Sequence, residues 1–424
     1  MNMTVQRLPV HFVADPKKVI LLYLEPVEGS KRLERFTNFA VGLSDDDADK
    51  LHRKTKALFE HRHRNFNNNL LEYANKGMQT YGKNIPLTEK QKLVFGSFLT
   101  KEYSVEAAAL FNPSIVQHPD QSGLKDGDTR FVLTTRSVGE GHISSIGFME
   151  GIIDKNQDVT FTQQGPWRTT GKKVLPKNGD DDHYDIHFDY TVPLPERVIF
   201  PNAKSEQMGM EDLRMVRFEN EGEVCFFGTY TAYDGKNIQS KMLQTNDFQH
   251  FEIRNLKGSQ VDNKGMAYFP RKINGEYVML SRQGGESLCI MRSKDHFTWN
   301  NKIPLQEPTR PFELVQVGNC GSPIETPEGW LMITHHVGPM RRYSLGVTLL
   351  DLEQPEKVIA ILDEPLMEPL ESEREGYVPN VLYTCGWMEH GDSILIPYAM
   401  SDVACGFATV KTADLLSRLR KGIV

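Results

Sequence analysis

Cysteine is scarce in this chain of 424 residues, and the sequence contains no Cys-x-x-Cys pair. The five cysteines are an odd number at wide spacing, which argues against a disulfide framework and against a zinc ribbon or finger. We therefore expect buried, reduced thiols that pack as small hydrophobic side chains. The rest of the composition, with 39% hydrophobic and 25% charged residues, is that of a folded globular protein.

Long hydrophobic runs and an excess of positive charge are also lacking. The longest apolar run near the N-terminus, residues 19–24, is too short for a signal peptide core or a membrane span, which predicts a cytoplasmic protein. There are 49 basic and 56 acidic residues, giving a net charge of −7. Nucleic acids and anionic membranes attract clustered positive charge, so neither is an expected partner, and a small ligand is favoured.

Helical signals are concentrated at the start of the chain. Over residues 44–76, apolar side chains recur at steps of three and four after a capping start at Ser44, which predicts one long helix. Its basic stretch, residues 61–64, is interpreted as a solvated face. Thr88 and Gln91 predict a second helix over 89–99. We expect an N-terminal helical extension over residues 1–100 and a C-terminal helix over 411–424.

Between these ends the sequence is rich in strands and turns. Short runs of Val, Ile, Phe and Tyr are broken by Gly, Asn, Asp and Pro, with little helical periodicity. An apolar strand with a polar end recurs at residues 131–136, 226–231, 277–282, 330–335 and 394–399. Five copies predict an all-β fold, a five-bladed β-propeller over residues 101–410, although a β-sandwich stays open on this pattern alone.

A propeller would bring the polar strand ends together, because its innermost strands line one central channel. We interpret the five copies as those innermost strands. The segment Gly209–Arg214 adds two carboxylates and a guanidinium within four residues. A carboxylate beside an arginine is either a structural ion pair or, when it faces a pocket, a general acid, and the residues alone leave both open.

Several motifs in a fixed order resemble glycoside hydrolase family 130, which contains β-mannoside phosphorylases and hydrolases. They are Gly209-Met-Glu-Asp-Leu-Arg214, Asn263-Lys-Gly265, Phe269-Pro270, Gly318-Asn-Cys-Gly-Ser-Pro323, Gly329-Trp330 and Thr334-His-His-Val337. The resemblance covers nearly all of residues 101–410 and implies a five-bladed propeller. The helical front resembles the extension of the family's longer members.

The resemblance also implies an inverting mechanism and assigns roles within it. Asp212 matches the general acid, which passes its proton through a hydroxyl of the bound sugar. Asn112 and Arg136 match positions that hold the scissile mannose, and Asp402 matches a carboxylate that binds sugar hydroxyls. The remaining predicted substrate contacts are Glu211, Arg214 and Tyr230, the last as a stacking platform. The expected substrates are β-mannosides, with β-1,2 linkages first and β-1,4 linkages second.

The nucleophile decides the reaction, because a phosphate dianion needs several cationic donors whereas water needs only a carboxylate base. The predicted nucleophile pocket contains Lys264, Arg282, Gln316 and His335. Lys264 and Gln316 stand where the phosphorylases carry Arg and Lys, so the cluster is incomplete. We therefore expect hydrolysis, with Glu286 as the base and Glu140 as another candidate.

Two alternatives are kept beside hydrolysis. The first is a phosphorylase that releases mannose 1-phosphate, with inorganic phosphate as co-substrate; otherwise no cofactor is expected. The second is a non-catalytic carbohydrate-binding propeller, which the complete motif around Asp212 disfavours. No metal is expected, because the acidic stretch 180–189 with its two histidines has no helical pattern that would place them on one face. A homo-oligomer is left open.

Overall fold

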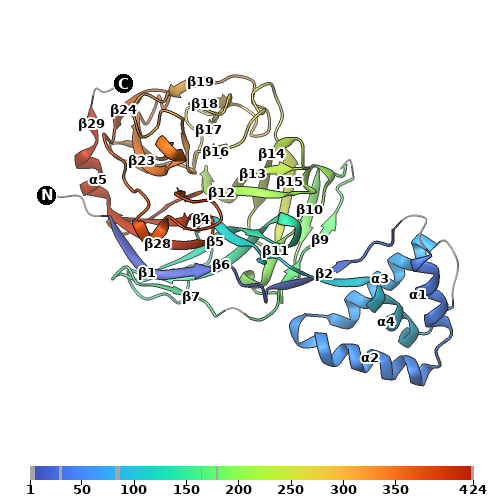
Figure 1. Cartoon of the computed structure of the whole chain (residues 1–424). Helices are drawn as coiled ribbons and strands as arrows, with labels where there is room; N and C mark the ends of the chain where they lie inside the picture. The colour runs from blue at the N-terminus through green and yellow to red at the C-terminus, as the bar shows by residue number, and fades with distance from the viewer. Residues whose placement is uncertain (1–4, 28–30, 82–85, 164, 178–179, 422–424) are drawn as a thin grey trace. The chain divides into compact units, whose positions relative to one another are not determined.

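The computed structural model describes residues 5–27, 31–81, 86–163, 165–177 and 180–421. The chain forms two compact units and is mostly β (Figure 1). Unit 1 comprises residues 1–14, 106–164 and 171–424, and unit 2 comprises residues 15–105 and 165–170. Across the described residues, no helix has the length and apolar character needed to cross a membrane.

Unit 2 is a small helical body with a two-stranded ribbon. Its elements are β2 (Val19–Tyr23), α1 (Arg32–Val41), α2 (Asp45–Phe59), η1 (Glu60–Arg62), α3 (Phe66–Tyr81), α4 (Glu89–Phe98), β3 (Thr100–Ser104) and β8 (Thr169–Thr170). The predicted start signals are confirmed. Ser44 accepts a hydrogen bond from the Asp47 backbone N–H, and Thr88 and Gln91 form a capping box at the start of α4.

The single helix predicted over 44–76 is wrong, because the chain breaks between α2 and α3. Asn65 takes a left-handed conformation with φ of 52°, which ends the helical geometry. At the break, Arg62 and His63 turn toward Glu102 on β3, at 2.9 and 2.7 Å. The His63 side chain is buried, so the prediction of a solvated basic face is wrong there as well.

Unit 1 is built from antiparallel strands. In chain order they are β1 (Gln6–Val13), β4 (Ala109–Gln117), β5 (Thr129–Val138), β6 (Ser144–Ile153), β7 (Val159–Phe161), β9 (Lys172–Val174), β10 (Tyr184–His187), β11 (Arg197–Ile199), β12 (Gly209–Asn220), β13 (Glu223–Tyr233), β14 (Ile238–Thr245), β15 (His250–Asn255), β16 (Ala267–Tyr268), β17 (Tyr277–Ser281), β18 (Leu288–Ser293), β19 (Ile303–Gln306), β20 (Gln316–Asn319), β21 (Ile324–Thr326), β22 (Gly329–Val337), β23 (Tyr343–Leu350), β24 (Val358–Ile361), β25 (Leu382–Tyr383), β26 (Met388–His390), β27 (Ser393–Met400), β28 (Ala404–Lys411) and β29 (Arg420–Lys421). Their neighbouring sheets pack through buried apolar clusters.

The five predicted copies are all strands, namely β5, β13, β17, β22 and β27. Each pairs antiparallel with the strand that follows it and with a strand that precedes it. The preceding strands are β4, β12, β16, β20 with β21, and β25 with β26. The copies are therefore the second strands of their groups, and the interpretation of them as innermost strands is wrong.

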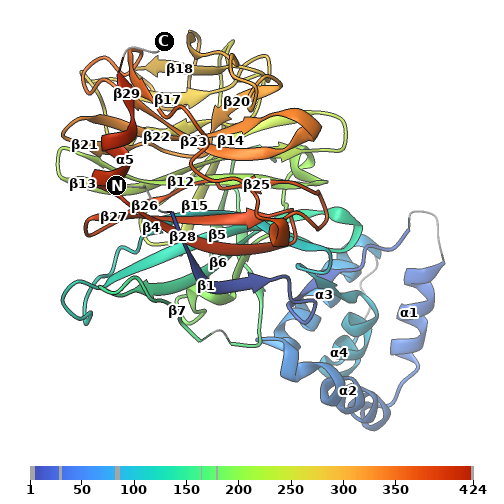
Figure 2. The same ribbon diagram turned by 60° about the vertical axis from the view of Figure 1, so that its left-hand side comes forward.

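The two ends of the chain contribute to unit 1 through strands. β1 pairs with β28, so residues 6–13 lie beside residues 404–409 (Figure 2). The N-terminal region is therefore helical only after residue 31, whereas the predicted extension began at residue 1. At the other end, helix α5 (Thr412–Arg418) is followed by β29, which pairs with β24. Residues 422–424 of the predicted C-terminal helix lie outside the described residues.

Candidate active site

Two β-bulges place the central polar side chains of the site. The register of β4 against β5 shifts between Phe111 and Ser114, and that of β12 against β13 shifts between Glu211 and Arg214. At the shifts, Asn112 and Asp212 take left-handed conformations with φ of 49° and 56°. A bulge re-aims a side chain out of the regular pleat, and non-glycine residues in this region carry backbone strain. Strain of this kind at two polar residues is typical of functional sites.

The bulges bring these two side chains together across 100 residues of sequence. Asn112 Nδ2 donates a hydrogen bond of 2.6 Å to Asp212 Oδ1. Arg136 Nη1 donates to the same oxygen at 3.2 Å. Among the described residues, no protein group holds the second oxygen, Asp212 Oδ2, and the amide oxygen Asn112 Oδ1 is buried without a partner. Both oxygens are therefore available to a bound ligand.

Arg136 organises the carboxylates around it. Its Nη2 donates to Glu211 Oε1 at 2.7 Å, and its Nε donates to Ser144 Oγ at 2.9 Å. The guanidinium also lies over the Phe111 ring, 5.0 Å from the centroid. The other oxygen of Glu211 lies 3.8 Å from Lys264 Nζ. Four of the predicted site residues thus form one connected group with Asp212.

The pKa values of two carboxyl groups are displaced in opposite directions. Burial by itself would raise the pKa of Asp212, but the positive charges of Arg136, Lys264 and Arg214 outweigh it and hold the pKa well below its ordinary value. Asp212 is therefore ionised in the free protein. Burial and the negative charge of Asp212 raise the pKa of Asp402 from 3.8 to about 6. Asp402 thus lies within the electrostatic reach of the group around Asp212.

A second cluster beside Asp212 is cationic. Arg214 is buried, and its Nη2 donates to the Tyr383 hydroxyl at 2.8 Å. Arg282 donates from Nη1 to His335 Nε2 at 3.0 Å. Within the described part of the chain, neither guanidinium forms an ion pair with a carboxylate, and the Nε of each is buried without a partner. The two charges repel, since Arg214 helps to lower the pKa of Arg282.

His335 is held as a neutral acceptor between these groups. Its Nδ1 lies 3.1 Å from the carbonyl oxygen of Asn319, which only a protonated nitrogen can bond. Nε2 then accepts from Arg282 and from Gln316, the latter at 2.7 Å. Burial and the charge of Arg282 lower the pKa of His335 well below its ordinary value, in agreement with this tautomer. Gly318 allows the approach, because a Cβ there would lie 2.5 Å from His335 Cε1.

Two predicted residues do not join the site. Tyr230 is 2% exposed, and its hydroxyl donates to Glu206 Oε1 at 2.7 Å inside the core. Because its side chain is buried and its hydroxyl is already bonded, its use as an open stacking platform is wrong. Glu286 is exposed in the loop after β17, where its backbone carbonyl accepts a hydrogen bond from the Val317 N–H. Its carboxyl group has no described contact with the Asp212 group.

Other residues of the site were not predicted from the sequence. Tyr383 bonds Arg214 and meets the His335 ring edge-on at 5.0 Å, yet it lies on a two-residue strand. Ser144 fixes Arg136, and the Asn319 carbonyl fixes the His335 tautomer. These roles follow from strand pairing, since Ser144 and Val138 are register partners and Asn319 pairs with Thr334. Local sequence carries no signal for them.

The arrangement defines a class of protein. A buried carboxylate with one free oxygen, an amide beside it and a set of guanidinium donors suit a polyhydroxylated ligand, because sugar hydroxyls both donate and accept. The cationic cluster alongside suits an anion. Together they are the machinery of an enzyme that acts on glycosides.

Comparison with known proteins identifies the family. A family model described as beta-1,4-mannooligosaccharide phosphorylase matches residues 177–421. A 1,2-beta-oligomannan phosphorylase from Thermoanaerobacter sp. (strain X514) is 34% identical over 258 residues, which are 60% of this chain and 84% of that protein. A beta-1,2-mannobiose phosphorylase from the same organism is 29% identical over 323 residues, covering 73% and 93%. The chain belongs to glycoside hydrolase family 130.

Solved structures support the fold. The beta-1,2-mannobiose phosphorylase from Listeria innocua, in complex with beta-1,2-mannobiose, matches with a TM-score of 0.50 and 20% identity over 75% of this chain and 93% of that one. A structure described under the family's glycoside hydrolases that target beta-1,2 mannosidic linkages in Candida mannan matches with a TM-score of 0.54 and 19% identity over 74% and 87%. The family resemblance drawn from the motifs is confirmed, and the chain is an enzyme of the glycoside hydrolase or phosphorylase type.

Proposed function

We propose that the chain is an inverting phosphorylase of β-mannosides, which uses inorganic phosphate to release mannose 1-phosphate from short oligosaccharides. The two Thermoanaerobacter relatives are named as phosphorylases of β-1,2-linked mannosides, and the matching family model is described as a β-1,4-mannooligosaccharide phosphorylase, which supports this alternative over hydrolysis. A β-1,2-linked manno-oligosaccharide is therefore the first substrate to test. The prediction of hydrolysis rested on the replaced residues Lys264 and Gln316, and the geometry offers other cations in their place.

The observation that carries the proposal is the pair of guanidinium groups without ion-pair partners, Arg214 and Arg282. Arg214 is buried and Arg282 is half-buried, and removing a guanidinium from water without an ion-pair partner is costly, so we expect an anion to complete the site. Phosphate fits, because planar guanidinium groups donate paired hydrogen bonds to its oxygens. Water would need a carboxylate base instead, and the predicted base Glu286 is exposed and not held in the group.

In the proposed reaction, a phosphate oxygen attacks the anomeric carbon from the face opposite the leaving group. The new carbon–oxygen bond forms as the glycosidic bond breaks, so the β-mannoside gives α-mannose 1-phosphate. The departing oxygen takes a proton that originates on Asp212, directly or through a sugar hydroxyl. Asn112 and Arg136 orient the Asp212 carboxyl, and Asp402 is proposed to bind sugar hydroxyls.

The low pKa of Asp212 gives phosphate a second part in this scheme. An ionised Asp212 holds no proton to donate, so the resting site is not ready for catalysis. Phosphate bound at Arg214 would neutralise part of the positive charge that holds the pKa down and would add negative charge nearby. Both effects raise the pKa of Asp212 and allow it to carry a proton. Binding of phosphate, the nucleophile, thus prepares Asp212 to act as the general acid.

We also propose that unit 1 is a five-bladed β-propeller, with residues 101–410 as the catalytic part. Five antiparallel strand groups follow one another along the chain, led by β4, β12, β16, β20 and β25. The last group is completed by β1 from the N-terminus, an arrangement that joins the ends of a ring of blades. Residues 32–98 contain the helices of the predicted extension.

The direct test is product analysis. The protein is incubated with β-1,2-mannobiose in the presence and absence of phosphate, and mannose and mannose 1-phosphate are quantified by anion-exchange chromatography. We expect mannose 1-phosphate that depends on phosphate. Free mannose as the sole product, at a rate independent of phosphate, would refute phosphorolysis and restore hydrolysis. No product from β-1,2- or β-1,4-mannobiose would refute both.

Two variants separate the roles of the site. Asp212→Asn removes the proton donor and is expected to lower kcat by at least about 10²–10⁴-fold while leaving folding intact. Arg282→Gln is expected to raise the KM for phosphate much more than the KM for the mannoside. Arg342→Gln is the matched control, because Arg342 is 44% exposed and pairs with Glu368 on the surface. Arg342→Gln should change neither kcat nor the KM for phosphate or the mannoside.

A further inference from the structure

Unit 1 contains a second polar cavity at the strand ends opposite the site described above. Its volume is about 620 Å³, and it is lined in part by Gln117 on β4 and Arg217 and Glu219 on β12. The same two strands carry Asn112 and Asp212 near their starts. On β12 the lining runs from Met215 to Glu219, so its nearest residue follows Asp212 by three positions, about 10 Å along an extended strand. The cavity is within the range of about 300–1,000 Å³ of ligand sites.

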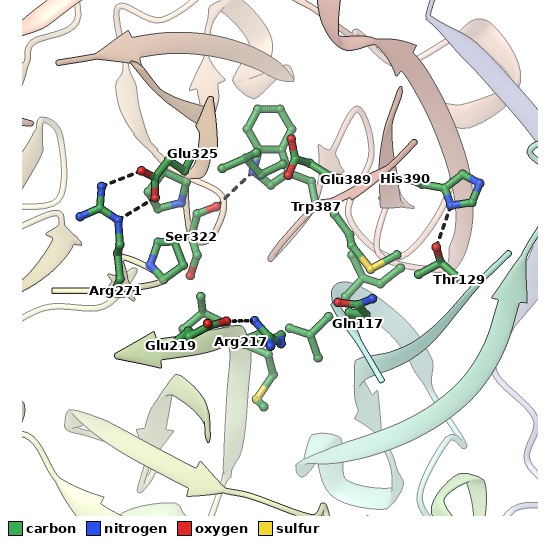
Figure 3. Close-up of a pocket in the computed structure, with 18 of the residues that line it drawn as sticks. Gln117, Thr129, Arg217, Glu219, Arg271, Ser322, Glu325, Trp387, Glu389 and His390 are labelled. Atoms are coloured by element: carbon green, nitrogen blue, oxygen red, sulfur yellow. Dashed lines mark hydrogen bonds and ion pairs between the residues drawn. The ribbon is translucent and has the colours of Figure 1, made fainter. Parts of the chain in front are cut away.

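The charged side chains of this cavity are largely paired with one another. Arg271 donates to both oxygens of Glu325 at 2.7 and 2.6 Å, and Arg217 donates to Glu219 at 2.6 Å (Figure 3). The lining has two guanidiniums against four carboxylates, the latter being Glu219, Glu221, Glu325 and Glu389, so its formal charge is −2. With both cations already engaged, a free phosphate or another anion is disfavoured.

The lining of the cavity is also unsuited to a cation. In the described ranges, no group of three or more His, Cys, Asp or Glu side chains is placed to hold a metal ion. His390 is engaged at both nitrogens, by Thr129 Oγ1 at 3.0 Å and the Asp154 carbonyl at 2.9 Å. An organic cation would need an open aromatic face. Trp387 is 5% exposed, and its ring N–H is taken by the Ser322 carbonyl at 3.1 Å.

The cavity retains hydrogen-bonding capacity for a neutral ligand. Ser322 is 8% exposed, and its Oγ is buried without a partner. Gln117 and Glu389 are exposed, and no hydrogen bond or ion pair of either side chain is described. Figure 3 shows Gln117, Ser322 and Glu389 around one central space, with Arg271–Glu325 on one side and Thr129–His390 on the other. Apolar side chains lie between these groups, notably Val116, Met215 and Ile324.

We propose that this cavity is a second, non-catalytic site for a neutral oligosaccharide. Sugars present hydroxyls that donate and accept together with apolar C–H faces, which matches a lining of amide, hydroxyl and paired charges separated by aliphatic side chains. The choice of a β-mannoside as its ligand rests on the proposed function. Arg217 and Glu219 lie toward the opposite end of β12 from Asp212, so we expect a sugar bound beside them to leave Asp212 unoccupied.

The test uses the full-length Asp212→Asn protein, in which turnover is blocked. Titration calorimetry with β-1,2-mannotriose is expected to give two sites per chain. Adding Gln117→Ala and Glu389→Gln should weaken one of them by about tenfold, the loss expected for hydrogen bonds to polar and charged groups. Glu223→Gln is the matched control, an exposed carboxylate on the adjacent hairpin, and should leave both sites unchanged. One site per chain in the Asp212→Asn protein refutes the proposal.

Activity separates this inference from the proposed function. In the wild-type background, Gln117→Ala with Glu389→Gln should leave kcat/KM for β-1,2-mannobiose within about twofold, because surface changes away from a site cost little. If the protein turns over no β-mannoside, the proposed function fails, and the cavity is then titrated with cellotriose, xylotriose and maltotriose. Binding that the double substitution weakens supports the second site, whereas no binding of any of these refutes it.

Discussion

Asp402 provides a test of the electrostatics of the site that requires no substrate. Its pKa is raised from 3.8 to about 6 by burial and by the charge of Asp212. One pKa unit corresponds to about 1.36 kcal/mol, so a displacement of about two units amounts to roughly 3 kcal/mol. Between these pH values the folded state binds more protons than the unfolded state, and stability therefore falls as pH rises through about 4 to 6.

The substitution Asp402→Asn removes this dependence. Relative to the wild type, the variant should gain up to about 3 kcal/mol in free energy of unfolding at neutral pH and nothing below about pH 4. Asparagine tolerates the left-handed backbone at this position, where φ is 54°. The buried histidines His335 and His336, whose pKa values are lowered, make the free energy of unfolding rise with pH in the same range. Both proteins contain these histidines, so the difference between the two proteins isolates the Asp402 contribution.

The measurement is guanidinium unfolding at about pH 4 and about pH 7, with tryptophan fluorescence as the signal, so that the linkage of protonation and stability is read directly. Trp299, Trp330 and Trp387 all lie in unit 1 and report on it. Asp126→Asn, at an exposed carboxylate, is the control and should show no pH-dependent difference. In an Asp212→Asn background the Asp402→Asn effect should shrink. An equal difference at both pH values would refute the reasoning.

The remaining predictions concern geometry. Gly318→Ala should displace His335 and Arg282 and raise the KM for phosphate, measured by initial rates, because the new Cβ would lie 2.5 and 3.1 Å from their atoms. Asn112→Ala removes the 2.6 Å hydrogen bond to Asp212 and should lower kcat, measured by initial rates; it should also lower the melting temperature, because alanine disfavours the left-handed backbone at this position. Thr88→Ala should destabilise unit 2 by about 1 kcal/mol in thermal unfolding, through loss of the α4 cap, and leave turnover unchanged.

Local signals in the sequence were sufficient for several elements. The Thr88–Gln91 capping box and the five polar-ended strands were found because both depend on residues close together in the chain. The long helix over 44–76 was wrong because the chain breaks at Asn65, next to Arg62 and His63, which bond to Glu102 of another element. Periodicity describes one face of a helix and contains no information on such a distant partner.

In the active site, too, the sequence revealed the local motif but not the partners that are distant in the chain. The motif around Asp212 was visible in the sequence, yet its environment was not, since Asn112 and Arg136 are 100 and 76 residues away. Tyr230 was misplaced because its side chain is buried and its hydroxyl bonds Glu206, 24 residues away in the chain.

Sequence by itself determined the chemical types present, namely an acid within a specific motif, cationic and amide side chains, strands of the right pattern and the family to which they belong. Tertiary structure alone decided that Asp212 is ionised at rest, that Arg214 and Arg282 form no ion pair among the described residues and that His335 is neutral. The physical reason is that a pKa and the cost of a buried charge depend on distance and burial, which strand pairing sets between residues far apart in the chain.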